Sequence, residues 1–290
     1  MTYAGVELGG TKCVAILACG PTDVLAREVV ATTSPEETLD RIERILREWR
    51  RERGFAGLGV ASFGPLDVDP QSPTWGRVLA TPKPGWAETD VGRRLRAAAG
   101  VPVVVDTDVN GAAAAEMRWG SGRGLADFAY VTVGTGVGVG LIVAGQPTRG
   151  FGHCELGHIR VRRAPGEDWP GACPYHGDCV EGLAAGSALK MRFGERLDSI
   201  GPDDPVWDSV ADTLAQLCHA IVCAAAPRRI AMGGGVIAAQ PHLLGKIEAR
   251  LVASLGAFLA LPDSPYVRAP ELGADAGPLG AIALAMSATA

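Results

Sequence analysis

The order of strand and helix patterns repeats in this chain, and this repetition is the feature that most constrains its fold. Each series consists of three strands, a helix, a strand, a helix, a strand and a helix. The first series is predicted at residues 2–9, 13–18, 24–31, 35–49, 57–63, 91–99, 101–105 and 108–117. The second is predicted at residues 128–133, 139–144, 158–163, 208–226, 228–233, 242–254, 266–268 and 276–288. The sequence therefore predicts a duplicated α/β unit.

Composition and charge limit the classes of function. A chain of 290 residues suits two domains of ordinary size, and 47% hydrophobic with 20% charged residues is typical of a globular protein. A formal net charge of -5 does not favour a nucleic-acid partner or an anionic membrane surface. No apolar run approaches the roughly 20 residues that a bilayer requires, and the first residues, MTYAGVELGGTK, lack the pattern of a secretory signal. We therefore expect a cytoplasmic protein with no nucleic-acid or membrane partner.

Cysteine usage agrees with that compartment and raises a question about one loop. Seven cysteines without secretion suggest a reducing cytosol, where disulfides are uncommon. Four of them lie in apolar sequence and are predicted to be small core residues: Cys13, Cys19, Cys218 and Cys223. The stretch GACPYHGDC, residues 171–179, places Cys173, His176 and Cys179 at spacings of three. A disulfide, an accident of composition and three ligands of a metal site are the alternatives for this loop.

Each series opens with a glycine-rich turn between its first two strands. The first turn is GGTK, residues 9–12, and the second lies in GTGVGVG, residues 134–140, where Gly136 is a candidate for a positive φ angle. Glycines let backbone N–H groups approach an anion closely. An ordinary hairpin turn explains either run alone, but the matched pair favours two phosphate-binding turns. A dinucleotide-binding motif is not favoured, because the apolar segment LIVA and not a helix follows the second run.

Six motifs resemble, in their order and spacing, those of the ROK family of sugar kinases. They span Glu7 to Val236 and are ELGGTK, TDVNGAAAAE, VGTGVGVG, ELGH, CPYHGDCVEG and MGGGV. The resemblance implies the actin-like ATPase (ribonuclease H-like) fold, an α/β fold of two duplicated βββαβαβα domains with a cleft between them. It implies an N-terminal sugar kinase domain at residues 1–112 and 275–290. A C-terminal domain with the zinc loop and nucleotide-binding elements is implied at residues 113–274.

Asp108 is the candidate catalytic base. Phosphoryl transfer needs a group that takes the proton of the sugar hydroxyl, together with residues that position both substrates. Asp108 follows a buried strand and begins an alanine-rich helix, where the positive end of the helix keeps a carboxylate ionised. A plain helix N-cap is the alternative reading of Asp108. The resemblance identifies Asp108 as the base and leaves Asp106 a structural role.

The resemblance also implies a sugar site and a nucleotide site. The implied hexose contacts are Gly64, Pro65, Thr107, Glu155, His158 and Glu181. The implied nucleotide contacts are Gly9, Gly10, Thr11, Lys12, Thr135, Gly136, Gly233, Gly234 and Gly235. Glu7 ends the first strand, where the resemblance gives it a role in placing Mg²⁺ through water. A simple strand-end residue is the alternative for Glu7.

The resemblance favours the metal interpretation of residues 171–179. It implies a Cys2His2 zinc site with four ligands: His158, Cys173, His176 and Cys179. His153 and Cys154 are rival fourth ligands. Because four protein ligands leave no open position, the implied zinc is structural. Its role would be to hold Glu155 and Glu181 around the hexose.

The activity that the resemblance predicts is ATP-dependent phosphorylation of a hexose, with structural Zn²⁺ and with Mg²⁺ bound to ATP. ASFGPLDVD, ATPKPGW and the histidine of the cysteine cluster resemble the fructokinase branch, so D-fructose and fructose 6-phosphate are the expected substrate and product. Thr107 replaces the Asn that usually precedes the base in the family's glucokinases. A mannokinase or glucokinase-type broad hexokinase and a catalytically idle sugar sensor are the alternatives. The family is commonly dimeric, so a homodimer is expected.

Overall fold

The chain divides into two compact units. The computed structural model describes residues 1–163, 166–262 and 264–289. One unit contains residues 1–124, 147–153 and 274–290, and the other contains residues 125–146 and 154–273. The chain therefore passes from one unit to the other four times. The functional division that the sequence places after residue 112 stays a prediction.

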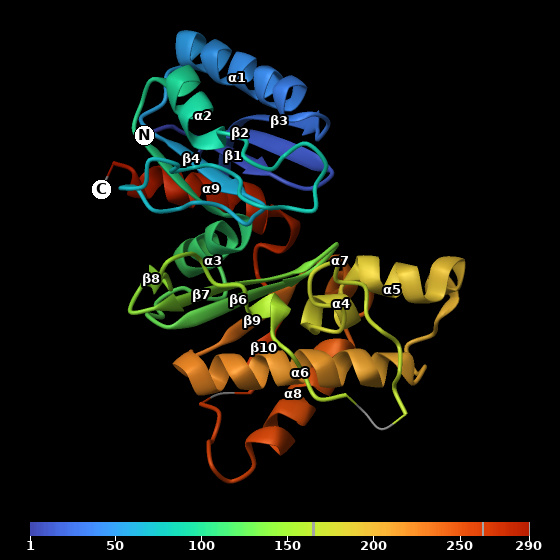
Figure 1. Cartoon of the computed structure of the whole chain (residues 1–290). Helices are drawn as coiled ribbons and strands as arrows, with labels where there is room; N and C mark the ends of the chain where they lie inside the picture. The colour runs from blue at the N-terminus through green and yellow to red at the C-terminus, as the bar shows by residue number, and fades with distance from the viewer. Residues whose placement is uncertain (164–165, 263, 290) are drawn as a thin grey trace. The chain divides into compact units, whose positions relative to one another are not determined.

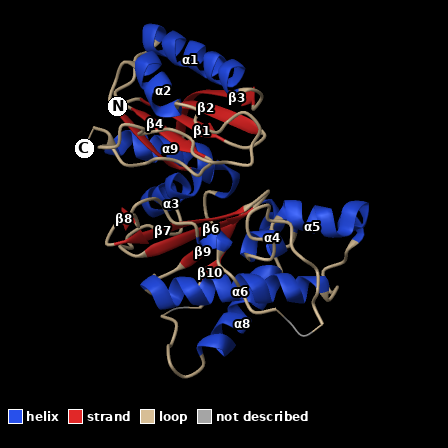
Figure 2. Ribbon diagram, in the orientation of Figure 1, coloured by secondary structure: helices blue, strands red, loops and turns tan. Residues whose placement is uncertain are grey.

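The first unit is a five-stranded sheet with helices on both faces (Figures 1 and 2). Its strands are β1 (Tyr3–Leu8), β2 (Lys12–Gly20), β3 (Asp23–Ala31), β4 (Leu58–Ser62) and β5 (Val103–Thr107). Its α-helices are α1 (Pro35–Glu52), α2 (Val91–Ala99), α3 (Asp108–Trp119) and α9 (Ala276–Ser287). Helices α1 and α2 pack together on one face of the sheet, and α3 and α9 pack together on the other.

Helix α1 shows how the sequence specifies this packing. The Ser34 hydroxyl accepts the N–H of Glu37 at 3.3 Å and so caps the helix, as its sequence predicts. Leu39, Ile42 and Leu46 recur at helical spacing and are fully buried. These side chains fill the core between α1 and the sheet.

The second unit contains a sheet of the same strand order (Figure 2). Its strands are β6 (Phe128–Val133), β7 (Val137–Val143), β8 (Gln146–Pro147), β9 (Ile230–Gly233) and β10 (Val267–Arg268). Its α-helices are α4 (Val180–Ala184), α5 (Gly186–Phe193), α6 (Val206–Ala225), α7 (Gly235–Ala239) and α8 (Leu243–Leu255). Among the described residues, no helix is both long and apolar enough to cross a bilayer.

The two sheets share one topology. Counted along the chain within each unit, the spatial order of strands is third, second, first, fourth and fifth. In each unit the first strand is antiparallel to the second and parallel to the fourth. This shared order confirms the predicted duplication of an α/β unit.

One predicted strand, at residues 158–163, is wrong. This segment follows a short 3₁₀ helix, Leu156–His158, and the outermost strand of the second sheet is β8 instead. Ile159 and Val161 do pack against the core of the second unit, which explains the alternating pattern. The backbone of Arg160 forms an isolated bridge with Cys179, so the segment pairs with the cysteine loop and not with the sheet.

Candidate active site and metal centre

Sheet topology brings the predicted catalytic segments of the first unit to one edge. Strands β1, β4 and β5 are parallel, and their ends are in register, with Leu8 opposite Ser62 and Ser62 opposite Thr107. The first glycine turn, Gly64 and Asp108 follow these three strand ends. Ligands of open α/β sheets bind at the carboxyl ends of the strands. This edge is therefore the candidate catalytic edge.

Asp108 is the first residue of α3 and is half-buried. The N-cap is Thr107, whose hydroxyl accepts the N–H of Asn110 at 3.2 Å, so the simple N-cap reading of Asp108 is wrong. Asp108 accepts the N–H of Val109 at 2.9 Å, and the positive end of the helix favours its ionised form. Thr107, an expected hexose contact, is itself buried.

Asp106 is buried and well supplied with donors. One of its oxygens accepts the N–H of Thr107 and the side-chain amide of Asn110, each at 2.8 Å. The other accepts the guanidinium of Arg149 at 2.5 Å. A buried carboxylate needs such compensation for its lost hydration. Asp106 therefore ties the first turn of α3 to residues 147–153.

Glu7 lies near Asp108 at the same edge. The pKa of Glu7 is raised to about 7, chiefly by burial and then by the negative charge of Asp108, while Lys12 and Arg27 oppose the rise. Carboxylate oxygens are ligands that Mg²⁺ prefers, and a divalent cation would relieve the repulsion between these two groups. The donor set at this edge therefore fits Mg²⁺.

The first glycine turn is closed by its own backbone. Gly9 donates its N–H to the carbonyl of Lys12 at 3.1 Å, and Thr32 donates its hydroxyl to the carbonyl of Gly9 at 2.8 Å. A Cβ atom at Gly9 would lie 2.5 Å from the carbonyl oxygen of Lys12, so a larger residue would displace backbone. The turn therefore requires glycine at this position.

His153 braces the segment that contains Gly64 and Pro65. The Gly64–Pro65 peptide bond is cis, and Leu66 donates its N–H to Nε2 of His153 at 3.0 Å. A ring nitrogen that accepts a hydrogen bond is unprotonated, so a neutral His153 carries its proton on Nδ1. His153 therefore belongs with the predicted sugar segment of the first unit and is not part of the four-residue cluster described below.

In the second unit, the second glycine turn contacts a carboxylate. Glu181 accepts the N–H of Val137 at 3.0 Å, and a Cβ atom at Gly136 would lie 2.5 Å from the same Glu181 oxygen. The expectation of a positive φ at Gly136 is wrong, since its φ lies outside that range. A larger residue at Gly136 would therefore displace the Glu181 carboxylate and not strain the backbone.

Three expected hexose contacts of the second unit lie together. His158 ends the 3₁₀ helix of ELGH, with Nε2 3.9 Å from a Glu155 oxygen and Nδ1 4.0 Å from a Glu181 oxygen. Glu155 is exposed, whereas His158 and Glu181 are half-buried. This grouping offers two carboxylate acceptors and an imidazole to sugar hydroxyls.

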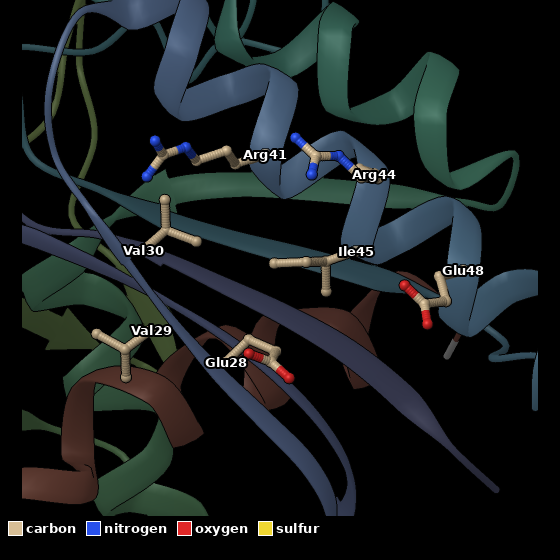
Figure 3. A pocket seen from close by; sticks show the side chains of 7 residues that line it. All are labelled: Glu28, Val29, Val30, Arg41, Arg44, Ile45 and Glu48. Atoms are coloured by element: carbon tan, nitrogen blue, oxygen red, sulfur yellow. The ribbon is translucent and has the colours of Figure 1, made fainter.

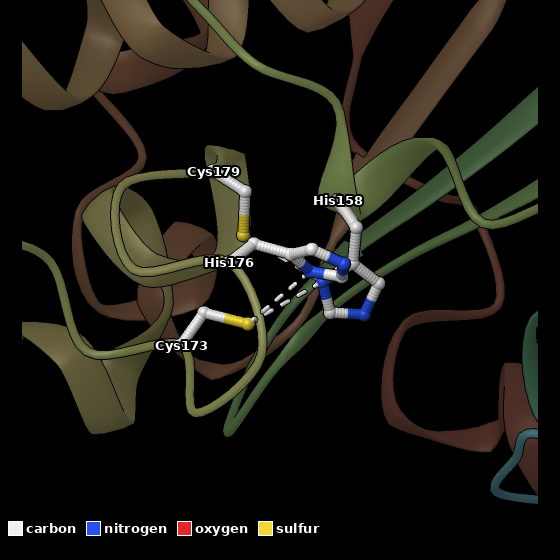
Figure 4. A group of neighbouring side chains, drawn as sticks. All are labelled: His158, Cys173, His176 and Cys179. Carbon is white, nitrogen blue, oxygen red and sulfur yellow. Dashed lines mark hydrogen bonds between the residues drawn. The ribbon is translucent and has the colours of Figure 1, made fainter.

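The four expected metal ligands form one cluster (Figure 4). One ligand atom from each residue lies within 4.8 Å of the others: His158, Cys173, His176 and Cys179. The Cys173 sulfur is 3.7 Å from Nδ1 of His158 and 3.6 Å from Nδ1 of His176. The Cys179 sulfur is 3.6 Å from Nδ1 of His158.

This donor set fits a tetrahedral metal ion. Zn–S bonds of about 2.3 Å and Zn–N bonds of about 2.0 Å at a tetrahedral angle place nitrogen and sulfur about 3.5 Å apart, close to the observed separations. All seven cysteines are free thiols, so the disulfide alternative for Cys173 and Cys179 is not realised. Burial raises the pKa of Cys179 to about 11, and a bound cation is the means by which such a thiol becomes a thiolate.

The remaining expected nucleotide contacts lie at a strand end of the second sheet. Gly233 ends β9, Gly234 follows with φ 92°, and Gly235 begins the short helix α7. This strand-to-helix turn lies at the carboxyl end of β9, which is parallel to β6. In the first sheet, the first glycine turn and Gly64 likewise follow the carboxyl ends of parallel strands, β1 and β4.

A pocket of ≈ 330 Å³ lies elsewhere, between β3 and α1 (Figure 3). It is lined by Glu28, Val29, Val30, Arg41, Arg44, Ile45 and Glu48. None of the residues that the sequence predicts for the active site lines it. Its two arginines and two glutamates balance in charge and favour no particular ligand.

Two neighbours of the catalytic edge escaped sequence-based prediction of their roles. They are Arg149, which binds Asp106, and His153, which accepts the N–H of Leu66. Both lie in residues 147–153, a segment of the first unit that is flanked in sequence on both sides by residues of the second unit. The only local indication was the stretch RGFGH, residues 149–153, which Cys154 separates from ELGH. No periodicity identifies a partner so far away in sequence.

Comparison with known proteins agrees with the geometry. The sequence matches the ROK family over residues 3–288. It is 40% identical to a fructokinase of Zymomonas mobilis, across 99% of this chain and 97% of that protein. The ROK hexokinase of Thermus thermophilus has a TM-score of 0.80 at 28% identity, covering 99% of this chain and 98% of that one. A ROK family glucokinase from Streptomyces griseus, in complex with glucose and AMPPNP, has a TM-score of 0.78 at 26% identity, covering 99% and 100%.

These similarities extend over nearly the whole chain and confirm the predicted actin-like ATPase fold, with its two five-stranded sheets. The chain belongs to the ROK family.

Proposed function

We propose that this chain is an ATP-dependent hexose kinase that converts D-fructose to fructose 6-phosphate. The observation that carries the proposal is 40% identity to a fructokinase over 99% of the chain, against 33% over 69% and 26% over 96% of the chain for two glucokinases of the family. The position of Asp108 at the start of α3, on the catalytic edge, supports the same activity.

Asp108 is the proposed general base. The 6-hydroxyl oxygen of the sugar forms a bond to the terminal phosphorus of ATP, and the bond from that phosphorus to its bridging oxygen breaks. The hydroxyl proton passes to Asp108, and ADP leaves with the electron pair of the broken bond. The helix end that favours ionised Asp108 prepares it to accept this proton.

The nucleotide is proposed to bind at the two glycine turns and at Gly233–Gly235. Mg²⁺ would neutralise phosphate charge at the catalytic edge, with Glu7 holding it through water. The closed first turn supports a phosphate-binding role, because its rigid backbone is organised before the ligand arrives.

The sugar hydroxyls are proposed to bind Glu155, His158 and Glu181. If Nδ1 of His158 binds the metal, its Nε2–H remains as a donor beside Glu155. We propose that the metal is a single structural Zn²⁺, which would fix the ring of His158 and the loop that leads to Glu181. Protein from which the metal has been removed would then bind the sugar more weakly.

Cytoplasmic location and a homodimer complete the proposal. Seven free thiols support a reducing compartment. The homodimer remains an expectation drawn from the family resemblance.

A panel of hexoses in a coupled assay of ADP release tests the proposal, with the position of the product phosphate determined by NMR. We expect kcat/KM for fructose to exceed that for glucose and mannose, and the phosphate to lie on O6. A higher kcat/KM with glucose or mannose than with fructose would contradict fructose as the preferred substrate, but the assignment as a hexose kinase would stand. Calorimetric sugar binding without ADP release from any hexose would favour the idle sugar sensor.

A further inference from the structure

A lysine from a distant segment reaches the first glycine turn. The ammonium of Lys83 donates a hydrogen bond to the carbonyl oxygen of Gly10, 73 residues away in sequence. It also lies 5.7 Å from the ring centroid of Phe63, a cation–π distance. Because Phe63 directly follows β4 and donates its N–H to the carbonyl of Leu8, Lys83 lies at the catalytic edge of the sheet.

The segment that carries Lys83 is held firmly. Trp86 is fully buried, donates its indole N–H to the carbonyl of Thr33 at 3.0 Å, and packs edge-on against Phe63 at 5.2 Å. The N–H of Trp86 donates to the carbonyl of Lys83 at 3.2 Å, which closes a turn between the two residues. A lysine has a flexible stem, so this anchoring and the ring of Phe63 restrict where its charge can lie.

We propose that the Lys83 ammonium binds the phosphoryl group that passes from the nucleotide to the sugar. This inference rests on the proposed kinase function and gives it a further catalytic residue. During transfer, negative charge is spread over the phosphoryl oxygens and develops on the leaving oxygen, so a fixed cation beside the phosphoryl group stabilises the transition state more than the bound substrate. An ammonium has three N–H donors, so a hydrogen bond to a phosphoryl oxygen is compatible with the one to Gly10.

The charges around the turn agree with this role. Burial raises the pKa of both Glu7 and Cys13, and two cations oppose the rise: Lys12, which begins β2, acts on Glu7, and Lys83 acts on Cys13. Two cations thus act on the turn, Lys12 from within it and Lys83 from a distant segment. A structural alternative exists, in which Lys83 only ties residues 81–86 to the turn.

Three variants distinguish these roles: Lys83→Met, Lys83→Arg and Lys83→Ala. The methionine variant keeps an unbranched apolar stem and removes the charge. We expect it to lower kcat about 10²-fold, the effect typical of one fixed donor to a transition-state oxygen, while the KM for fructose and the Tm stay within error of wild type. Lys83→Arg should lose less than tenfold in kcat, because it keeps the cation.

Chemical rescue supplies the readout that a structural role would not move. Ethylammonium added to Lys83→Ala should raise kcat with saturation, whereas tetramethylammonium, a cation without N–H donors, should not. A kcat for Lys83→Met within threefold of wild type, or a Lys83→Ala variant indifferent to ethylammonium, would overturn the proposal. Wild-type protein that releases no ADP with any hexose would instead contradict the kinase function itself.

Discussion

The two glycine turns lie at equivalent places in two sheets of one topology, yet their surroundings differ in charge. The turn at Gly9–Lys12 is bordered by Lys12 and contacted by Lys83, and it closes on its own backbone. The turn at Gly136 meets Glu181, whose carboxylate accepts the N–H of Val137. Duplication has therefore kept the backbone, while side chains from distant segments give each turn its own chemistry.

This difference indicates a division of work. Cations at the first turn suit a phosphate, whereas a carboxylate at the second turn already uses one backbone donor that an anion would otherwise bind. Glu181 also lies near His158 and the metal cluster, so the second turn is linked to the sugar site. We therefore expect substitutions at the first turn to act chiefly on phosphoryl transfer, and substitutions at the second turn to act on sugar binding as well as on the nucleotide.

The largest effect should come from Asp108→Asn in the first unit. Asparagine keeps the shape of the side chain but cannot accept the proton, so kcat should fall by about 10²–10⁴-fold while the Kd for fructose changes little. Steady-state kinetics and calorimetry measure the two quantities separately. Near-normal turnover in this variant would remove Asp108 from the role of base.

Cys179→Ser, in the second unit, should weaken fructose binding and stability more than it lowers kcat. Loss of one ligand should lower zinc content from about one per chain and destabilise the protein by about 3 kcal/mol, which corresponds to a fall of roughly 6–12 °C in Tm. The KM for fructose should rise, with the KM for ATP less affected, because the cluster lies beside Glu181.

The prediction that Cys223 is a core residue is wrong, because Cys223 is exposed. It also lies outside the cluster, so Cys223→Ser is the matched control. It should keep wild-type zinc content, measured by elemental analysis, and wild-type Tm. Protein that is stable, active and free of metal would contradict the zinc site. A chelator should reproduce the phenotype of Cys179→Ser.

Glu7→Gln tests the electrostatics of the first turn. Because folding raises the pKa of Glu7 from 4.5 to about 7, its contribution to stability is fully present below pH 4.5 and is lost as pH rises through 7. The loss amounts to at most about 3 kcal/mol. We therefore expect Tm to fall less between pH 5 and pH 8 in Glu7→Gln than in wild type.

The same Tm measurements with added Mg²⁺ test whether Glu7 helps to hold the metal ion. If Glu7 helps to hold Mg²⁺, millimolar MgCl₂ at pH 8 should raise the Tm of wild type more than that of Glu7→Gln. Identical pH slopes in the two proteins would show that Glu7 does not titrate in this range and would weaken its assignment to the metal.

The sequence was sufficient for the elements that depend on local patterns. The amphipathic stripe of α1, its Ser34 cap and the apolar strands were all predictable, because burial periodicity and capping are local properties. The strand expected at residues 158–163 failed for a related reason. Its alternation is real, but it reports packing of Ile159 and Val161 and not pairing with a sheet.

The site was predictable only in part. Spacing marked Cys173, His176 and Cys179 as a candidate metal loop, but the metal interpretation and the choice of His158 came from a family resemblance. The contacts of Lys83 with Gly10 and of Arg149 with Asp106 join segments far apart in sequence. No local pattern encodes such pairs, so they become visible only when the sheet order is known.

The smallest and most direct test compares alanine at equivalent glycines, Gly9→Ala and Gly136→Ala. At Gly9 the added carbon meets the carbonyl of Lys12 at 2.5 Å, so the backbone of the turn must move and the KM for ATP should rise roughly tenfold. At Gly136 the carbon meets the end of the Glu181 side chain at 2.5 Å, so the carboxylate must move and the KM for fructose should rise by a similar factor. In Gly9→Ala the KM for fructose should change less than threefold, whereas in Gly136→Ala the KM for ATP should also rise, because the second turn is a proposed nucleotide contact.

Two control glycines show whether these shifts come from the contacts or from loss of glycine itself. A Cβ atom at Gly20 in the first unit or at Gly201 in the second would have no neighbour within 4 Å among the described residues. Gly20→Ala and Gly201→Ala should therefore keep both KM values. If Gly136→Ala raises the KM for ATP as much as that for fructose, the second turn binds the nucleotide as well as supporting the sugar site. The two turns would then differ in the charge of their surroundings but not in whether they bind the nucleotide. If Gly136→Ala raises only the KM for fructose, distant side chains have divided two copies of one backbone between the two substrates.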